Sequence, residues 1–270
     1  MFSTARIPTI LIALGVSFPL ALNAQFPATP DRIAGAGSML FQSNISSGAF
    51  GNPAIPDSVT GARFFIYSSQ SFMTPELTET GLAFLIRLPG STQLSLGYAV
   101  KGFDLYKKQH ALLCLSRHFG GVTAGIRITY GGTQFGEGIQ GDHLWSVIPG
   151  TRIRFGKQIE MLAGMRIPLR KAKDLHQEEA RLGCIYHFSS RFAVGVEAVQ
   201  TDRQLLLSGV LRYRPGERIE FQGGLSGQEP VWGFGCSVEV KGFRIMLAAC
   251  HRSWLGFSPG LSVESPLVRR

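Results

Sequence analysis

The sequence has few charged residues and few cysteines, and these shortages exclude several classes of function. The four cysteines, Cys114, Cys184, Cys236 and Cys250, lie in separate segments without the close spacing of a zinc site or a redox pair. We therefore expect them to be small hydrophobic residues, and we expect no metal. The chain contains neither a glycine-rich phosphate-binding loop before a helix nor a G-x-S-x-G elbow. The sequence thus predicts no cofactor and no enzymatic activity.

Long hydrophobic runs are also missing after residue 24, where no stretch reaches the roughly 18 apolar residues of a membrane-spanning helix. The one apolar run, Ile7–Leu22, follows a single positive charge at Arg6 and ends before a polar region. This arrangement is typical of a secretory signal peptide, which we assign to residues 1–24. A permanent transmembrane helix is the less favoured alternative, because prolines and a glycine interrupt the run.

The charges have an excess of basic residues that does not indicate nucleic-acid binding. The formal net charge is +9, from 27 Lys and Arg against 18 Asp and Glu. The basic residues are scattered singly along the chain instead of forming a basic run, so we do not expect a nucleic-acid partner.

From Ala62 onward, segments of about ten residues alternate between large apolar and small or polar side chains, the period of a β-strand with two different faces. In Leu94–Lys101, Val122–Tyr130 and Trp232–Val240 the even positions are mostly large and apolar. A soluble sandwich and a membrane barrel both produce this pattern. The other face is rich in Gly, Ala and Ser with isolated Arg and Glu, which favours the enclosed lumen of a membrane barrel over a solvated sheet surface.

Turns of two lengths separate these segments. Tight turns such as Pro89–Ser91 and Phe119–Gly121 alternate with longer links such as Ser69–Thr78 and Gly102–Lys108. Short turns at one end and longer loops at the other are typical of outer-membrane barrels, with the short turns periplasmic. We expect strands to begin near Ala62, Glu79, Thr92, Gln109, Val122, Asp142, Gln158, Gln177, Arg191, Arg203, Arg218, Pro230, Phe243 and Phe257. The sequence therefore predicts an all-β, closed antiparallel transmembrane β-barrel of about 14 strands over residues 61–270.

Residues 25–60 precede the first strand and contain the irregular stretch GAFGNPAIPD, Gly48–Asp57. Its glycines and prolines exclude a helix and a central strand. Irregular backbone at membrane depth is tolerated where protein encloses it. We therefore expect an N-terminal hatch, or plug, that folds into the lumen from the periplasmic side.

The motif Asn52-Pro53-Ala54, placed after Arg32–Gly37 and ahead of about fourteen strands, resembles the FadL-like outer-membrane barrels. The closing stretch His251–Leu261 is more specifically similar to the end of PorV/PorQ-type barrels of the type IX secretion system. The resemblance implies a fourteen-stranded barrel with a hatch in the outer membrane of a Gram-negative, Bacteroidota-like bacterium. It implies a component of a protein secretion or surface-attachment machinery, with other secretion-system proteins as partners. The alternative is a passive transporter of small hydrophobic compounds.

The candidate site residues are the hatch motif and the charged residues expected on the inward face. Asn52, Pro53 and Ala54 are expected to hold the hatch, with Asn52 satisfying neighbouring backbone groups. The expected lumen-facing charges are Arg127, Arg154, Glu160, Arg166, Glu197, Arg212, Glu220, Glu239 and Arg244. Their mixed signs indicate pairs across the lumen, because an Arg that faces lipid costs about 2–4 kcal/mol at the membrane midplane.

Two further groups of residues remain open. His251 and Ser253 share one strand face and form, with Glu264, the best candidate for a hydrolytic set, but such pairs are common by chance. Several Trp and Tyr residues fall near predicted strand ends, which suits either an interfacial aromatic girdle or ordinary packing.

Overall fold

The computed structural model describes residues 27–41, 49–54, 61–136, 143–169, 178–201, 204–227 and 231–266. The signal peptide expected over residues 1–24 lies outside this part of the chain. No helix among the described residues is long and apolar enough to cross a membrane. The described chain is nearly all β-structure.

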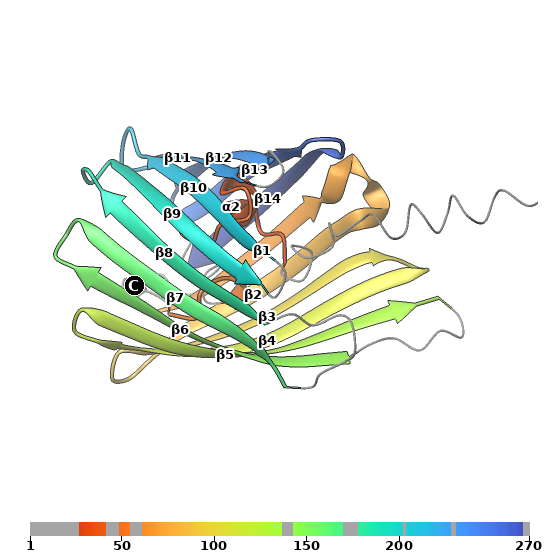
Figure 1. Ribbon diagram of the computed structural model, residues 1–270, viewed down its shortest axis with the longest axis horizontal. Coiled ribbons are helices and arrows are strands. Elements are labelled where there is room, and N and C mark those ends of the chain that lie inside the picture. Colours follow the sequence, from red (N-terminus) through yellow and green to blue (C-terminus); the bar gives the residue numbers. More distant parts are fainter. Residues whose placement is uncertain are drawn as a thin grey trace, which may run out of the picture.

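Fourteen antiparallel strands form one closed barrel, in which each strand pairs with its neighbours in sequence and β1 closes on β14 (Figure 1). The strands are β1 Ala62–Gln70, β2 Thr78–Leu88, β3 Thr92–Phe103, β4 Tyr106–Phe119, β5 Val122–Phe135, β6 His143–Phe155, β7 Ile159–Pro168, β8 Glu179–His187, β9 Phe192–Thr201, β10 Leu205–Tyr213, β11 Ile219–Ser226, β12 Val231–Val240, β13 Phe243–Arg252 and β14 Gly256–Pro266. This confirms the predicted closed barrel, and every predicted strand start lies within three residues of the observed one.

The connections follow the predicted alternation of short and long from β1 to β8, with one correction, whereas later links at the long-loop end, such as that between β13 and β14, are as short as the tight turns. Gly102–Lys108 was expected to be a longer loop, but β3 pairs with β4 as far as Phe103 and Tyr106. The two strands simply continue, so only Asp104 and Leu105 connect them. Two short 3₁₀ helices, η2 Ser71–Met73 and η3 Pro75–Leu77, lie in the longer link between β1 and β2.

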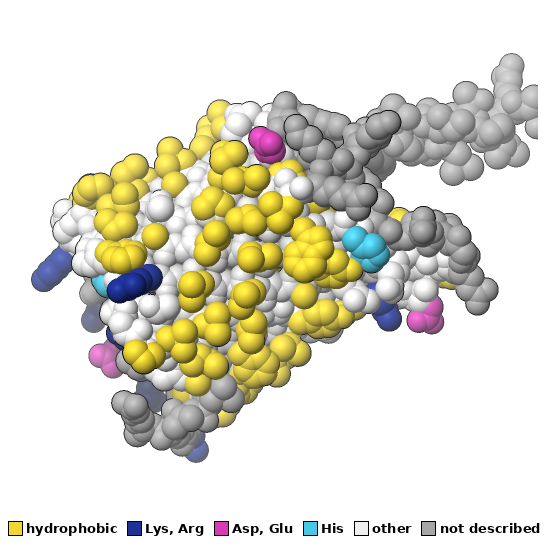
Figure 2. Space-filling view, turned by 90° about the horizontal axis from the view of Figure 1, so that it is seen from below, with side chains coloured by type: hydrophobic (Ala, Val, Ile, Leu, Met, Phe, Trp, Pro, Cys, Tyr) yellow, Lys and Arg dark blue, Asp and Glu magenta, His cyan; other side chains and the backbone are white. Residues whose placement is uncertain are grey.

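The two faces of the strands differ as the alternation predicts. Large apolar side chains are exposed on the outside, among them Leu96, Ile126, Val196, Leu207, Phe234 and Leu247. Small and charged side chains at the intervening positions are buried inside the barrel. Figure 2 shows the outer surface covered by a broad hydrophobic band, with charged side chains near its two ends. Such a band is the surface that a hydrocarbon layer requires.

A stretch of chain that precedes β1 lies inside the barrel and contains the short helix α2, Pro30–Ala34 (Figure 1). All five residues of α2 are buried. The helix can approach the wall because glycines face it: a Cβ atom on Gly233 of β12 would lie 2.2 Å from the carbonyl oxygen of Ile33. The wall and this stretch are therefore fitted to each other. We refer to residues 27–41 and 49–54 as the N-terminal segment.

Candidate functional site

The predicted hatch motif lies against the inner wall where β5, β6 and β7 run side by side. The Asn52 side-chain nitrogen donates hydrogen bonds to the carbonyl oxygens of Thr151 on β6, at 3.5 Å, and Ala163 on β7, at 3.3 Å. The Asn52 side-chain oxygen accepts a 2.9 Å hydrogen bond from the backbone N–H of Ala54. One amide thus joins two strands and fixes its own turn, as an Asn side chain in a turn is able to do.

Glycines of the wall make room for this motif. A Cβ atom on Gly125 of β5 would lie 2.2 Å from the carbonyl oxygen of Pro53. A Cβ atom on Gly150 of β6 would lie 2.5 Å from the side-chain oxygen of Asn52. Any larger residue at either position would displace the motif, so these glycines serve close approach of two backbones.

Arg127, one of the predicted inward charges, holds the chain just before the motif. Its side chain is 1% exposed and donates to the carbonyl oxygens of Ala49 at 3.1 Å and Gly51 at 2.6 Å. Hydrogen bonds from a charged donor in a buried place are stronger than neutral ones. Arg127 therefore binds the N-terminal segment to β5.

The ladder between β6 and β7 is interrupted beside the motif. Val147 pairs with Ile167, and pairing resumes only at Gly150 with Gly164. Pro149 lies in this interval and has no N–H to donate to a neighbouring strand, which is why Pro is rare in central strands. We call this interruption, residues 148–149 and 165–166, the β6–β7 seam.

A cavity of about 450 Å³, part of which is open to solvent, lies between the N-terminal segment and the seam. It is lined by Leu40 and Asn52 on one side and by Leu162 and Met165 on the other. Met165 is 41% exposed on the outer face of the barrel. Because Met165 lines the cavity and is also exposed on the outer face, the seam is the part of the wall that separates the cavity from the surrounding lipid. Only a small part of this volume is enclosed, so the passage is narrow in this state.

The polar part of the cavity lining comes from β7, β8 and β9. Glu197 on β9 accepts a 3.0 Å hydrogen bond from the backbone N–H of Met39 and pairs with Arg181 at 3.4 Å. Arg181 also pairs with Glu179, and Arg166 is buried on the same lining. Buried charges require partners, and these residues surround the N-terminal segment with them.

Arg32 of α2 is buried in the interior with an exposed fraction of 4%. Burial, with Arg181 nearby, lowers the pKa of the Arg32 guanidinium to about 9, while Glu179 and Glu197 act in the opposite direction. Arg32 therefore stays charged at neutral pH. Its side chain donates to the carbonyl oxygen of Gly37 at 3.2 Å and thereby closes the turn after the helix.

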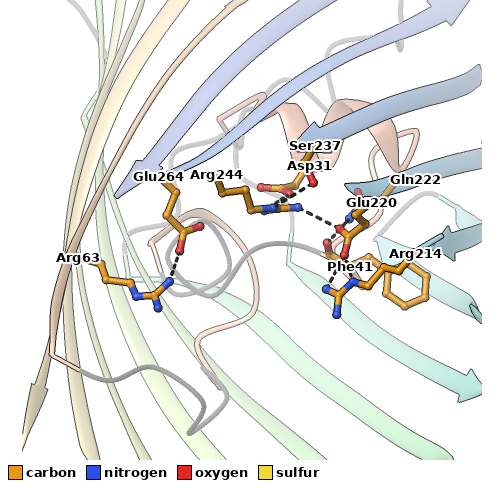
Figure 3. A network of polar contacts seen from close by, with 9 residues as sticks. All are labelled: Asp31, Phe41, Arg63, Arg214, Glu220, Gln222, Ser237, Arg244 and Glu264. Carbon is orange, nitrogen blue, oxygen red and sulfur yellow. Dashed lines mark hydrogen bonds and ion pairs between the residues drawn. The ribbon is translucent and has the colours of Figure 1, made fainter. Parts of the chain in front are cut away.

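A second polar network lies toward the short-turn end of the barrel (Figure 3). Glu220 on β11 pairs with Arg244 at 3.0 Å and with Arg214. Arg244 also reaches Asp31 of α2 at 3.2 Å. Gln222 donates to the carbonyl oxygen of Phe41 at 2.7 Å. The network therefore joins β11 and β13 to both ends of residues 31–41.

The remaining predicted charges lie at the same end but are less enclosed. Glu160 on β7 is buried and pairs with Arg152 and Arg154 of β6. Arg154 itself is exposed, and Arg212 packs over the ring of Phe41 with 4.8 Å between its guanidinium carbon and the ring centroid. Glu239 is exposed and makes no ion pair with any residue that the structure describes. Glu239 therefore does not contribute to the lumen network.

Several buried polar residues of these networks were missing from the predicted set: Asp31, Arg32, Glu79, Glu179, Arg181 and Glu264. Glu79 illustrates the role that was missed, since it accepts hydrogen bonds from Tyr67 at 2.6 Å and from the backbone N–H of Ala28 at 2.8 Å. Glu79 alternates with the outward-facing Leu82 and Phe84, so the strand pattern could have found it. Asp31 has no such signal, because it lies outside the strands.

The candidate hydrolytic residues do not come together. His251 stacks on Trp232 near the long-loop end, with ring centroids 5.3 Å apart. Glu264 lies near the short-turn end, where it pairs with Arg63 at 3.1 Å. Within the described ranges, no group of three or more His, Cys, Asp or Glu side chains is placed to hold a metal ion.

The fold is that of the FadL-type outer-membrane barrels. The chain matches the structure of the Ralstonia pickettii toluene transporter TbuX with a TM-score of 0.63 at 10% identity, over 88% of this chain and 98% of that one. A Pseudomonas aeruginosa FadL homologue matches with a TM-score of 0.62 at 8% identity, over 89% and 98%. The Pseudomonas putida toluene transporter TodX matches with 0.62 at 12% identity, over 88% and 97%. The sequence matches no protein-family model and no curated protein.

Proposed function

We propose that the protein is a passive transporter that carries small hydrophobic compounds across the outer membrane. The observation that carries the proposal is the cavity at the β6–β7 seam, where apolar side chains such as Leu40 and Leu162 lie beside charged ones and where the lining includes Met165, which is exposed on the outer surface. Two structures with the same fold, TbuX and TodX, are toluene transporters, which favours transport over a secretion role.

In this proposal the N-terminal segment acts as the hatch. Its buried contacts with Arg127, Glu197 and Gln222 hold it inside the barrel. A hydrophobic compound gains nothing from an aqueous channel, because transfer of apolar surface into water is unfavourable. It gains from a route that ends in the hydrocarbon layer.

The proposed exit is the β6–β7 seam. Two strands separate more easily where their backbone groups are not paired, because no hydrogen bond between the strands has to break. Pro149 lacks the N–H group that could form such a hydrogen bond in the seam. The cavity is too narrow for a toluene-sized compound as it stands, so passage requires the strands at Pro149 and Met165 to move apart. Asn52, which joins β6 to β7 beside the seam, is placed to limit that movement.

A reversible crosslink across the seam tests the route. In a background with the four native cysteines replaced by alanine, Pro149→Cys with Met165→Cys would form a disulfide across the seam. We expect uptake of radiolabelled toluene by cells of a Gram-negative host to fall when the pair is oxidised and to recover when it is reduced.

The matched control is Leu211→Cys with Gly223→Cys, which are paired on β10 and β11 where the ladder is complete. Oxidation of this pair should leave uptake unchanged. If cells with the protein take up toluene no faster than cells without it, the transport proposal is wrong. If uptake is present but insensitive to the crosslink at Pro149, only the route is wrong.

The second candidate, a component of a secretion or surface-attachment machinery, rests on the similarity of His251–Leu261 to PorV/PorQ-type barrels. An interior filled by the N-terminal segment, with α2 buried, suits a barrel that binds partners. Copurification of other secretion-system proteins from native membranes in mild detergent would favour this candidate. Recovery of the barrel alone would count against it. The assignment to a Bacteroidota-like host stays a prediction.

A further inference from the structure

The short-turn end of the barrel carries an excess of positive charge along the rim from β6 to β11, on strand ends and in the turns between them. The cations are Arg152, Arg154, Lys157, Arg191, Arg212, Arg214 and Arg218, and the anions are Glu160, Glu217 and Glu220. Figure 2 shows this end on the left, where most of the dark-blue side chains of that view gather. We call these ten residues the basic mouth.

The buried carboxylates of the basic mouth do not neutralise it, because its cations outnumber its anions. Glu160 accepts from both Arg152 and Arg154. Glu220 accepts from Arg214 and from Arg244 of β13. At Glu160, two guanidinium groups on one carboxylate leave a net positive charge, whereas at Glu220 the second guanidinium, that of Arg244, is also paired with Asp31. The exposed Arg154 in particular remains open to another anion.

Arg212 differs from the paired arginines of the basic mouth in its hydrogen bonding. It lies between these two pairs on β10, half-buried, and its guanidinium packs on the ring of Phe41. Its side chain has no hydrogen-bond acceptor in the described part of the chain. A guanidinium presents a planar fork of donors that matches a carboxylate, and stacking on an aromatic ring keeps that fork in place. Arg212 is therefore preorganised for an anion.

The charge of the basic mouth is directed toward the aqueous space and not toward lipid. On the outer wall at this end the strands β6, β8, β9 and β10 expose aromatic residues instead, among them Phe155, Tyr186, Phe192 and Tyr213. Aromatic side chains at this level are typical of a membrane interface. Short turns mark the periplasmic end of an outer-membrane barrel, so the basic mouth faces the periplasm.

We propose that the basic mouth is the docking surface for an acidic polypeptide segment of a periplasmic protein, with Arg212 binding a carboxylate of that segment. Neighbouring strands lie about 4.8 Å apart, so β6 and β10 are separated by about 20 Å along the rim. One small anion contacts one or two of these cations, whereas a chain of Asp and Glu residues contacts many at once. This role does not depend on transport through the seam.

The test measures binding of a fluorescent oligoglutamate to the full-length protein in nanodiscs of neutral lipid at low salt. We expect binding that weakens as salt is added, since the contacts are electrostatic. Arg212→Gln should weaken it by about tenfold, the equivalent of one hydrogen bond to a charged group. The charge reversals Lys157→Glu and Arg191→Glu, in exposed turns, should weaken it as well.

The matched control is Lys107→Glu, the same charge reversal on an exposed residue at the opposite end of the barrel. Binding that is absent, or that falls equally with Lys107→Glu, would overturn the proposal. If inorganic phosphate displaces the peptide at an ionic strength at which chloride does not, the basic mouth binds small anions instead. Heat-modifiable mobility on gels verifies that each variant is folded, and the turn variants remain a test if Arg212→Gln does not fold.

Discussion

The guanidinium of Arg127 on β5 donates a 2.6 Å hydrogen bond to the carbonyl oxygen of Gly51, and thereby binds the segment before the Asn52-Pro53-Ala54 motif to the barrel wall. The same nitrogen reaches Ala49. Ala49 and Phe50 are helical, which corrects the expectation that Gly48–Asp57 contains no helix, and Arg127 bonds the carbonyls at the end of these residues, where backbone acceptors need a partner.

Arg127→Met should release residues 49–54 without unfolding the barrel. Loss of hydrogen bonds from a charged donor costs about 1.5–3 kcal/mol each, while removal of a buried charge offsets part of that cost. Hydrogen exchange of the amides of residues 49–54 should accelerate, with exchange in β5 little changed. Arg117→Met, which removes an exposed outward arginine, is the control. Unaltered exchange at residues 49–54 would show that other contacts hold the segment.

Gly233→Val should displace α2, because the new side chain would overlap the carbonyl of Ile33. Arg32 is buried, so trypsin should not cleave after it in the wild-type protein and should cleave in this variant. Gly209→Val is the matched control, since a Cβ atom there meets open space. Mass spectrometry of the tryptic digests shows whether each variant is cleaved after Arg32. If Arg32 in Gly233→Val stays protected from trypsin, the barrel wall, and not α2, has moved to accommodate the new side chain.

Leu247→Arg tests the orientation of the strands in the membrane. Leu247 lies at the middle of β13 and is 62% exposed on the outer face. An arginine at the midplane costs about 2–4 kcal/mol of folding free energy, and one near the interface about 0–1. Urea unfolding in lipid vesicles should therefore show a large loss for Leu247→Arg and a small one for Phe243→Arg, at the short-turn end. Equal losses would contradict a lipid-facing band centred on β13.

The barrel was predictable from the sequence because its pattern is local. Alternation of side chains has a fixed period of two, so Leu94–Lys101 reveals its own orientation without knowledge of its partners. The same rule placed Arg127, Glu197 and Glu220 on the inward face, where they lie. The Gly102–Lys108 loop was predicted from its turn-forming residues and not from the alternation, and it was wrong because β3 and β4 pair as far as Phe103 and Tyr106.

The site was less predictable because its contacts are distant in sequence. Asp31 meets Arg244 across more than two hundred residues, and no spacing rule connects them. The β6–β7 seam depends on Pro149, whose effect is visible only when β6 and β7 are placed side by side. Likewise, the alternation puts Glu239 on the inward face but does not say that it lies at an exposed rim.

We expect Asn52 to hold β6 and β7 together through its side-chain nitrogen, which donates hydrogen bonds to both strands. Two substitutions separate this role from that of the side-chain oxygen, which accepts from the Ala54 N–H. Asn52→Ala removes the hydrogen bonds to Thr151 and Ala163 and also the acceptor for the Ala54 N–H. Three neutral hydrogen bonds contribute about 1.5–4.5 kcal/mol together, so the free energy of unfolding should fall by about that amount.

Asn52→Asp keeps the shape and the acceptor but directs a carboxylate oxygen at two carbonyl oxygens. If donation to Thr151 and Ala163 holds the strands together, Asn52→Asp should destabilise the protein at least as much as Asn52→Ala, although it is the more conservative change. Urea unfolding in vesicles at neutral pH measures both. A stable Asn52→Asp variant would mean that the turn at Ala54, and not the link between β6 and β7, is the role of this side chain.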